Sequence, residues 1–402
     1  MKIVHLSVYP PKNSFNSPNQ SGVAYYTYCL VNELDKQGYE NIVLCEKIND
    51  ISESYTQNKT QVVRCFDRKP GFILQVMRQI KAIPSIDIVH IQQEKSLYGN
   101  LITAYLLQFL LLWLKIRGIK VVTTIHGLVS YDTINTQFLA QNGAKNMPAL
   151  LGKFGFFMIY QPLFWFSQRI IVHTKSLLAT AKKDYHGNGK TYLIPIGIEL
   201  LKTESIDAAK RKLGLDISKK TILFFGFTNG YKGLDLLIEG FSEYSKQNSD
   251  AQLYIASGPS PNLVNDQDYM TNTYERLRTK AAKMINSSNF IWPYGSIEEN
   301  MIQTIYSAAD VVIFPYTVML AGSGPLSIAM SYSKPYLVSE PLSEYMTNSD
   351  LVFQLTSKSL QSVLKSFFSE YSKNQSSFED LKLNLTWQSL VQREYNHIYL
   401  FK

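Results

Sequence analysis

The chain has 402 residues, more than one hydrophobic core usually serves, so two domains are expected. Hydrophobic residues make up 45% and charged residues 18%, a globular composition that excludes an intrinsically disordered chain. The net charge of +8 is uneven, because residues 1–195 hold 21 Lys and Arg against 11 Asp and Glu. Such a basic half can face a phosphate-bearing substrate, an anionic lipid or nucleic acid, or it can be a merely soluble surface.

The cysteines and the most apolar segments indicate the cellular compartment of the protein. Cys29, Cys45 and Cys65 lack the spacing of a zinc site or a disulfide framework, so we expect buried thiols in a reducing compartment. The first residues, MKIVHLSVYPP, are too short an apolar run for a signal peptide and predict a β-strand. Residues 101–114 fall short of the ~20 residues of a membrane-spanning helix and predict a buried helix.

Short β-branched runs alternate with helical patterns along the first half, which is typical of βαβ units around a parallel sheet. Helices are predicted between the strands, including residues 24–37 and 101–117. The predicted strands are residues 2–7, 41–45, 61–65, 86–91, 120–125, 169–173 and 191–194.

The same alternation restarts after the turn IPIGIE, with helices predicted at residues 234–246 and 274–285. The fold class is therefore predicted to be α/β, with two Rossmann-like doubly wound domains facing across a cleft. Open parallel sheets bind ligands beyond the carboxyl ends of their strands, so the loops there are candidate sites. The predicted strands of this half are residues 221–225, 252–256, 290–292, 311–314 and 336–339.

Two loops of the second half have phosphate-binding features. The segment YTVMLAGSGP at residues 316–325 has small residues before a predicted helix, which lets the backbone approach a diphosphate. The segment FFGFTNGYKGLD places Lys232 just before another helix, where it can neutralise a leaving phosphate. The alternatives are an ordinary packing turn and a solvated surface lysine.

In the first half, the loop YPPKNSFNSPNQSG at residues 9–22 is long enough for a lid or an acceptor-binding segment, or it is a plain connection. It contains Asn19, and Gly22 can offer a helix-start amide to a phosphate. His126 follows a predicted strand and precedes a glycine, so its imidazole is well placed for a ligand. His90 lies within a strand and is interpreted as a core histidine. No Ser-His-Asp order, zinc spacing or GxxxxGK[ST] loop supports a hydrolase, metalloenzyme or P-loop protein.

Ten segments, in order, resemble the retaining GT-B glycosyltransferases of the family 4 type over nearly the whole chain. The resemblance implies an acceptor-binding domain at residues 1–195, a nucleotide-sugar-binding domain at 196–380 and a helix at 381–402 that crosses back to the first domain. The segments are SGVAYYTYCLVNEL, DIVHIQQEKSLYG, KVVTTIHG, RIIVHTKS, YLIPIGIE, ILFFGFTNGYKGLDLLIEGF, YIASGP, SAADVVIFPY, GPLSIAMSYSKPYLVS and LTWQSLVQREYNHIY.

The resemblance also implies roles for single residues. Lys232 is expected to bind the donor diphosphate, with Gly22 as an amide donor to the same group. His126 is expected to contact the donor sugar near the reacting carbon. Glu94 and Asn19 are expected on the acceptor side. The remaining implied donor contacts are Tyr294 and Gly295 near the base and the backbone of Ser323, Gly324, Pro325 and Leu326 at the phosphates.

The chain departs from the family pattern at two places. Leu320 and Ile328 stand where members commonly carry a pair of glutamates, and neither side chain can bind a hydroxyl. An arginine that often accompanies the phosphate lysine is also missing from residues 227–229. The prediction is a hexosyltransferase that moves a sugar from a nucleoside diphosphate to a glycan or lipid-linked acceptor in polysaccharide or glycoconjugate biosynthesis. The alternative is a non-catalytic GT-B subunit that binds sugar or acceptor beside a catalytic partner.

The resemblance further implies a front-face displacement with retained anomeric configuration and no metal cofactor. The aromatic run FGFFMIYQPLFWF at residues 154–166, flanked by Lys145, Lys153 and Arg169, predicts docking on an anionic membrane or, alternatively, a core helix interrupted by Pro162. We expect a cytoplasmic protein that can attach peripherally to the inner face of the cell membrane. Nucleic acid is not an expected partner, because no nucleic-acid-binding module is recognisable.

Overall fold

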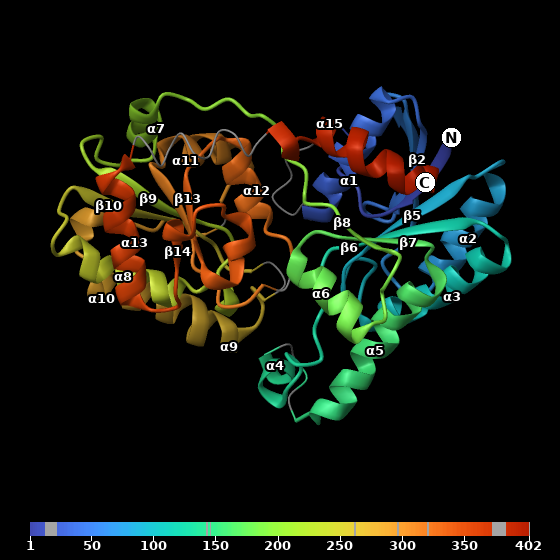
Figure 1. The fold of residues 1–402 in the computed structure, drawn as a ribbon, viewed down its shortest axis with the longest axis horizontal. Helices are drawn as coiled ribbons and strands as arrows, with labels where there is room; N and C mark the ends of the chain where they lie inside the picture. The colour runs from blue at the N-terminus through green and yellow to red at the C-terminus, as the bar shows by residue number, and fades with distance from the viewer. Residues whose placement is uncertain are drawn as a thin grey trace.

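The computed structural model has two α/β domains side by side, with the last helical segment returning to the first domain (Figure 1). It describes residues 1–12, 22–141, 144, 146–260, 263–295, 297–319, 321–371 and 383–401. Each domain has a central sheet covered by helices on both faces, which is the doubly wound arrangement predicted from the alternating pattern.

The first domain contains an eight-stranded sheet in the order β3-β4-β2-β1-β5-β6-β7-β8. All neighbouring strands are parallel except β3, which pairs antiparallel with β4 at the edge. The central strands are buried on both faces, as expected for near-continuous runs of Val and Ile. The strands are β1 Lys2–Leu6, β2 Glu40–Glu46, β3 Glu53–Gln57, β4 Thr60–Phe66, β5 Ile88–Gln93, β6 Lys120–Ile125, β7 Arg169–Val172 and β8 Thr191–Leu193.

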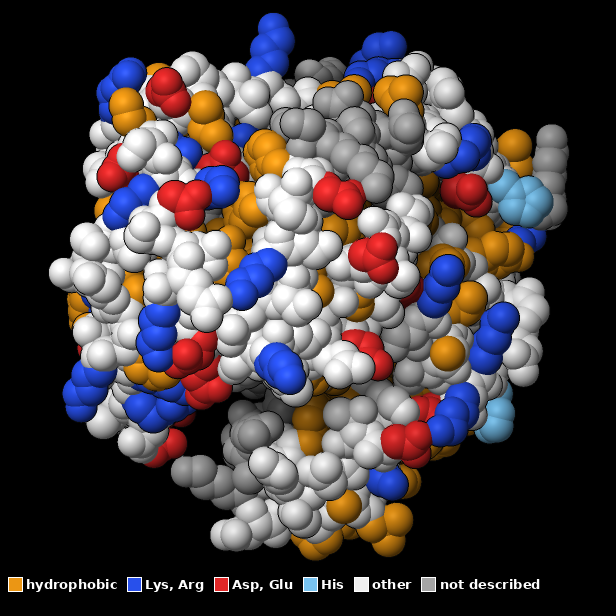
Figure 2. Space-filling model, turned by 60° about the vertical axis from the view of Figure 1, so that its left-hand side comes forward, with side chains coloured by type: hydrophobic (Ala, Val, Ile, Leu, Met, Phe, Trp, Pro, Cys, Tyr) orange, Lys and Arg blue, Asp and Glu red, His pale blue; other side chains and the backbone are white. Residues whose placement is uncertain are grey.

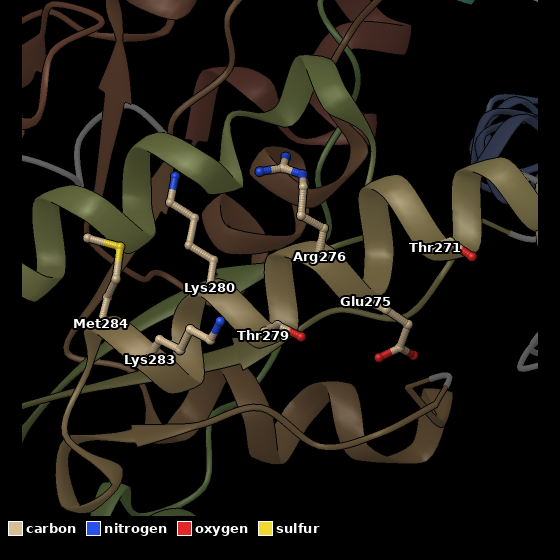
Figure 3. Close-up of a pocket in the computed structure, with 7 residues that line it drawn as sticks. All are labelled: Thr271, Glu275, Arg276, Thr279, Lys280, Lys283 and Met284. Atoms are coloured by element: carbon tan, nitrogen blue, oxygen red, sulfur yellow. The ribbon is translucent and has the colours of Figure 1, made fainter.

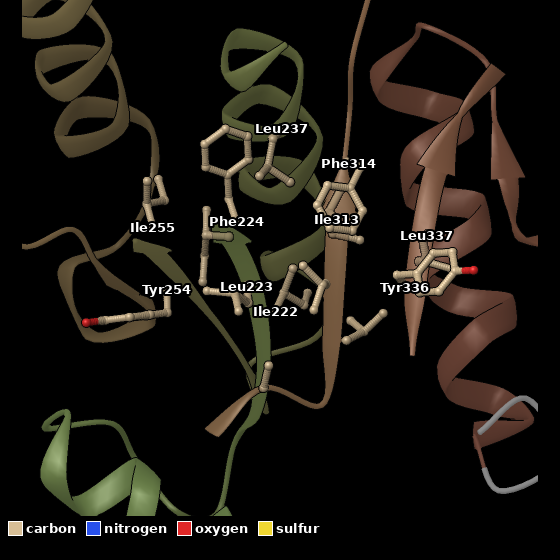
Figure 4. Close-up of a cluster of buried hydrophobic side chains, with 14 of the residues drawn as sticks. Ile222, Leu223, Phe224, Leu237, Tyr254, Ile255, Ile313, Phe314, Tyr336 and Leu337 are labelled. Atoms are coloured by element: carbon tan, nitrogen blue, oxygen red, sulfur yellow. The ribbon is translucent and has the colours of Figure 1, made fainter. Parts of the chain in front are cut away.

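The second domain contains a six-stranded parallel sheet in the order β11-β10-β9-β12-β13-β14. Its core is built by alternating aliphatic and aromatic side chains, among them Leu223, Phe224, Ile313 and Leu337 (Figure 4). The strands are β9 Lys220–Phe225, β10 Ala251–Ala256, β11 Phe290–Ile291, β12 Val311–Phe314, β13 Tyr336–Ser339 and β14 Val352–Phe353.

The helices that cover the two sheets follow the predicted alternation with the strands. In the first domain they are α1 Gly22–Lys36, α2 Phe72–Ala82, α3 Leu101–Ile116, α4 Thr136–Gln141, α5 Ala149–Phe166 and α6 Lys175–Asp184. In the second they are α7 Ile206–Lys212, α8 Leu234–Ser245, α9 Gln267–Tyr269, α10 Arg276–Met284, α11 Ile302–Ala308, α12 Gly324–Ser331 and α13 Ser357–Ser369. The predicted fold class is confirmed.

The strand order reverses direction once in each sheet, between β1 and β5 and between β9 and β12. Loops that leave the carboxyl ends of two such neighbouring strands turn to opposite faces and leave a crevice between them, where ligands of doubly wound folds bind. In the second domain, these are the loop that holds Lys232 and the loop that leads to α12.

The last helical segment, α15 Trp387–Leu390, η8 Val391–Tyr395 and α16 Asn396–Leu400, packs on the first domain beside α1 (Figure 1). The Tyr395 and Tyr26 hydroxyls share a buried hydrogen bond, and the Tyr399 hydroxyl lies 2.8 Å from His90 Nδ1. Residues distant in sequence therefore complete one hydrophobic cluster of the first domain.

Candidate functional site

The turn after β9 places Lys232 against the start of α12. Gly226, at the end of β9, has a φ of +126°, and a Cβ built on it would lie 2.6 Å from Lys232 Nζ and 3.4 Å from Pro325 Cγ. Only glycine allows this backbone conformation and this close approach together. Two loops predicted separately from the sequence therefore meet at one point.

Lys232 is a buried cation at this point. Its side chain is 6% exposed, and burial lowers the pKa of its ammonium group. Its Nζ lies 5.5 Å from the centre of the Tyr316 ring, and no acceptor among the described residues forms a hydrogen bond or ion pair with it. A buried charge is stable only when it is compensated, so the surroundings of Lys232 favour an anionic ligand.

The start of α12 has few backbone N–H groups available to bind an anion. Pro325 has no N–H group, so the expectation of an amide donor at that position is wrong on chemical grounds. The Leu326 N–H already donates to the capping Ser323 hydroxyl at 3.3 Å, and the Ser323 backbone interacts with the Tyr345 hydroxyl. Gly324 is therefore the position in this segment where a backbone N–H is best placed for an incoming anion.

Glu94 of the first domain lies opposite this turn. It follows β5 directly, its side chain is exposed, and the protein around it raises the pKa of its carboxyl group. Its negative charge also contributes, after burial, to the raised pKa of Tyr231, the neighbour of Lys232. The structure thus brings an acidic residue of the first domain and the lysine turn of the second close together.

His126 belongs to a buried chain of polar side chains that crosses the end of the first sheet. Gln92 Oε1 lies 2.8 Å from His126 Nε2, and His126 Nδ1 lies 3.3 Å from His173 Nε2. At the far ends, His173 Nδ1 lies 2.8 Å from the Ile194 carbonyl, and Gln92 Nε2 lies 3.3 Å from His90 Nε2. Burial lowers the pKa of all three histidines, that of His173 to about 4, so the chain is neutral.

When all of these groups are neutral, only one arrangement of donors and acceptors gives each of them a hydrogen-bond partner. The Ile194 carbonyl can only accept, so His173 donates from Nδ1 and must accept at Nε2 from His126 Nδ1–H. His126 Nε2 then accepts a hydrogen bond, so its partner must be the amide nitrogen of Gln92. The Gln92 oxygen and nitrogen therefore exchange the positions given above, and the oxygen faces His90. Both ring nitrogens of His126 are thereby engaged inside the protein, so its predicted contact with the donor sugar stays a prediction.

The two domains touch next to this chain. Gly127 pairs with Ala321 of the loop before α12 through an isolated antiparallel bridge. A Cβ built on Gly322 would lie 2.5 Å from Ile196 Cδ1 and 3.4 Å from His173 Cβ. The glycine-rich loop therefore lies against the histidine end of the first sheet, which brings the His126 region and the α12 loop together.

The other predicted site residues are more dispersed. Tyr294 is exposed after β11, with its ring 4.9 Å from the Arg278 guanidinium, and Gly295 follows with a φ of +94°. Gly22 is the exposed first residue of α1. Asn19 and Leu320 lie outside the described residues, and the roles predicted for Tyr294, Gly295, Gly22 and Asn19 stay predictions.

A separate depression is lined by residues of η2 Met270–Glu275 and α10 (Figure 3). Two of its cations, Arg276 and Lys280, form ion pairs with Asp235. Because these charges are already compensated, the depression offers weaker anion binding than the turn at Lys232.

Sequence reasoning overlooked Gln92 and His173. Val172 pairs with Ile125 in neighbouring parallel strands, so His173 and His126 both stand one residue beyond a strand end at the same edge. That shared position was the signal that could have paired them. No group of three or more His, Cys, Asp or Glu side chains in the described part of the chain could hold a metal ion.

Comparison with known families decides the identity. The profile described as Glycosyltransferase Family 4 matches residues 20–201, and the profile described as Glycosyl transferases group 1 matches residues 219–356. The chain belongs to glycosyltransferase family 4. As a family 4 glycosyltransferase it is a retaining enzyme that uses a nucleotide-sugar donor. No curated protein matches its sequence significantly.

Solved GT-B structures resemble this glycosyltransferase along its whole length. Sucrose-phosphate synthase from Thermosynechococcus elongatus has a TM-score of 0.71 at 16% identity. The superposition covers 100% of this chain and 99% of the synthase chain. HepE from Anabaena, solved with UDP-glucose, has a TM-score of 0.69 at 14% identity, with 99% of each chain covered. The catalytic domain of starch synthase IV from Arabidopsis thaliana, bound to ADP and acarbose, has a TM-score of 0.66 at 12% identity, covering 100% and 99%. At these identities the likeness establishes the GT-B fold.

Proposed function

We propose that this glycosyltransferase moves a hexose from a nucleoside diphosphate to a hydroxyl of a glycan or lipid-linked acceptor, in polysaccharide or glycoconjugate biosynthesis. The observation that carries the proposal is Lys232, a buried cation beside Gly226 and the start of α12. HepE was solved with UDP-glucose and starch synthase IV with ADP, and the fold that this chain shares with them supports a nucleoside-diphosphate sugar as donor.

The donor diphosphate would lie between Lys232 and Gly324. Lys232 supplies a full positive charge, and Gly324 supplies a backbone N–H at the positive end of the α12 dipole. Because Gly226 has no side chain, the space beside the ammonium group stays free. Together they would stabilise charge that grows on the leaving group during transfer, where such interactions contribute most to rate.

The transfer itself needs no dedicated protein base. The acceptor hydroxyl attacks the anomeric carbon from the face that the phosphate leaves, the bond between that carbon and the phosphate oxygen breaks, and the hydroxyl proton passes to the departing phosphate. The anomeric configuration is retained. The protein's task is to hold the two substrates together and to stabilise the diphosphate, which suits the neutral histidine chain and the charged Lys232.

The acceptor would enter from the first domain, past Glu94. This carboxylate is exposed, acts electrostatically on Tyr231 beside Lys232, and can accept hydrogen bonds from acceptor hydroxyls. The three cysteines are free and buried, which supports work in a reducing compartment such as the cytoplasm.

The test is a transfer assay with UDP-, GDP- and ADP-sugars, each with soluble oligosaccharides or a polyprenyl-phosphate-linked sugar as acceptor. We expect one donor to release its nucleoside diphosphate in an acceptor-dependent manner, with the anomeric configuration of the product read by NMR. Lys232→Ala should lower kcat by about 10²–10³-fold, the loss typical of removing one stabilising group. Lys246→Ala, an exposed lysine of the same domain, is the matched control and should keep full activity. Absence of turnover with every donor and both acceptor classes would overturn the proposal.

A further inference from the structure

Helices α3 and α5 have apolar faces on both sides. Their inner faces pack into the first-domain core, with Leu107, Leu110 and Tyr160 fully or almost fully buried. Their outer faces are apolar as well, with Leu150 78%, Ile116 75% and Phe154 61% exposed. Helices of a protein surrounded only by water normally present a polar outer face.

The exposed side chains form one stripe on each helix. In α3, Ile102, Phe109 and Ile116 recur every seven residues, which places them on one face. In α5, Leu150 and Phe154 are one turn apart and lie within the same sector of the helix as Trp165. We name these six residues the α3–α5 surface. The two helices pack against each other, so the stripes lie on neighbouring elements of the first domain (Figure 1).

The charge of this region is strongly one-sided. Residues 95–183 contain ten Lys and Arg but a single acidic residue, Asp132, so their net charge of +9 exceeds the +8 of the whole chain. Neither α3 nor α5 contains an acidic residue. The rest of the protein is therefore close to neutral, and the net positive charge is carried by the stretch of sequence that contains both helices.

The cations lie against the aromatic rings of these helices. Lys115 Nζ lies 5.4 Å from the centre of the Phe166 ring, and the Arg117 guanidinium lies 5.1 Å from that of Trp113. The charged ends themselves lie over the rings, so cations and apolar rings stand side by side, as they do in helices that bind a membrane interface. Lys95, which follows Glu94 at the cleft, lies 5.8 Å from the Phe156 ring, so the region continues to the acceptor side of the site.

The tip of this region is visible on the surface. In Figure 2, orange side chains gather at the lowest end of the molecule, the part to which Figure 1 assigns α4 and the start of α5, beside a hollow. By length and composition α5 could cross a membrane, but 44% of it is buried in the protein. Crossing would remove Phe156 and Leu163 from the core, so an orientation flat on the surface is favoured.

We propose that the α3–α5 surface docks on an anionic lipid bilayer, with the apolar stripes in the interface and the surrounding cations at the lipid phosphates. A second copy of the chain is a poorer occupant, because pairing this surface with itself would oppose two regions of net charge +9. Nucleic acid offers nothing to bury the aliphatic stripes. If the protein transfers sugar as proposed above, docking would let a lipid-linked acceptor reach Glu94 from the bilayer, and this consequence rests on the proposed function.

The experiment is co-sedimentation of the full chain with vesicles of phosphatidylcholine alone or mixed with phosphatidylglycerol, at low and high salt. The wild type should bind the anionic vesicles and release them as salt rises. The triple variant Leu150→Ser, Phe154→Ser and Trp165→Ser should bind at least about tenfold more weakly, because it removes all three α5 side chains of the α3–α5 surface.

A matched control replaces three exposed apolar residues of the second domain, Ile217→Ser, Val264→Ser and Leu355→Ser, and should bind like the wild type. Equal binding by the two triple variants, or no binding to anionic vesicles by the wild type, overturns the proposal. So does a wild-type dimer that the α5 variant converts to a monomer, or salt-sensitive binding to RNA in place of vesicles. Because vesicle binding requires neither donor nor acceptor, failure here is distinct from failure of the transfer assay.

Discussion

Replacing Lys232 by methionine should stabilise the empty protein and weaken its binding of the donor. The ammonium group is buried without a hydrogen-bond or ion-pair partner among the described residues, and burying such an ion costs several kcal/mol. Methionine keeps most of the apolar stem and removes the charge. We expect the free energy of unfolding to rise by about 1–2 kcal/mol, the lower part of the gain seen on replacing buried ions. For a domain of this size, that raises Tm by roughly 2–8 °C.

The same substitution should reduce stabilisation by nucleotide. A ligand at 100 times its Kd stabilises the native state by about 2.7 kcal/mol. Losing one charge-assisted hydrogen bond, worth about 1.5–3 kcal/mol, raises Kd about 10- to 150-fold. At an unchanged ligand concentration, the stabilisation then falls to roughly 0.3–1.4 kcal/mol.

Differential scanning fluorimetry with UDP, GDP, ADP and their sugar conjugates measures both quantities. Lys246→Met, at an exposed lysine paired with Glu243, is the control and should alter neither. A Lys232→Met protein that is less stable than the wild type when empty, or that keeps the full nucleotide shift, would refute the reasoning.

The remaining predictions concern the domain contact and the histidine chain. Gly322→Ala should cost about 1 kcal/mol in urea denaturation, because its methyl group collides with the end of the Ile196 side chain, which must shift, whereas Gly324→Ala meets nothing within 4 Å and should be nearly neutral. Tyr399→Phe should cost about 1–3 kcal/mol by leaving a buried imidazole nitrogen unpaired; an unchanged urea midpoint would contradict this. The folded pKa of His173 is about 4, below the unfolded 6.5, so its share of the free energy of unfolding, roughly 3 kcal/mol, should be lost as pH falls from 6.5 to 4. His173→Gln should make the fall of stability with pH shallower, while the other buried histidines keep their share. In ¹⁵N NMR, His126 and His173 should both carry their proton on Nδ1; an Nε2 proton on His126 would contradict the inferred direction of the chain.

Much of the fold could be predicted because buried parallel strands are marked by dense β-branched runs. The strands at residues 120–125, 311–314 and 336–339 match β6, β12 and β13 residue for residue. The sequence prediction missed β3, whose ESYTQ is a polar edge strand held by pairing with β4 alone. It also missed β14, which has two residues and carries no periodicity.

The site was predictable where strand order brings loops together. Lys232 and the α12 loop follow β9 and β12, which become neighbours only once the sheet reverses its order, so their meeting follows from the fold class. The histidine chain was harder, because which face each ring takes depends on the register of three strands. That Pro325 cannot donate a backbone hydrogen bond could have been predicted from the sequence alone, because proline has no N–H group.

The return of the last helical segment to the first domain has a consequence for synthesis of the protein. Tyr395 and Tyr399 are made about 200 residues after β8, the last strand of the sheet that they complete. At roughly 5–20 residues per second, that interval lasts about 10–40 s. During it, the face of α1 that holds Tyr26 lacks its partner, so the last contacts of the first domain can form only after the second domain has been synthesised.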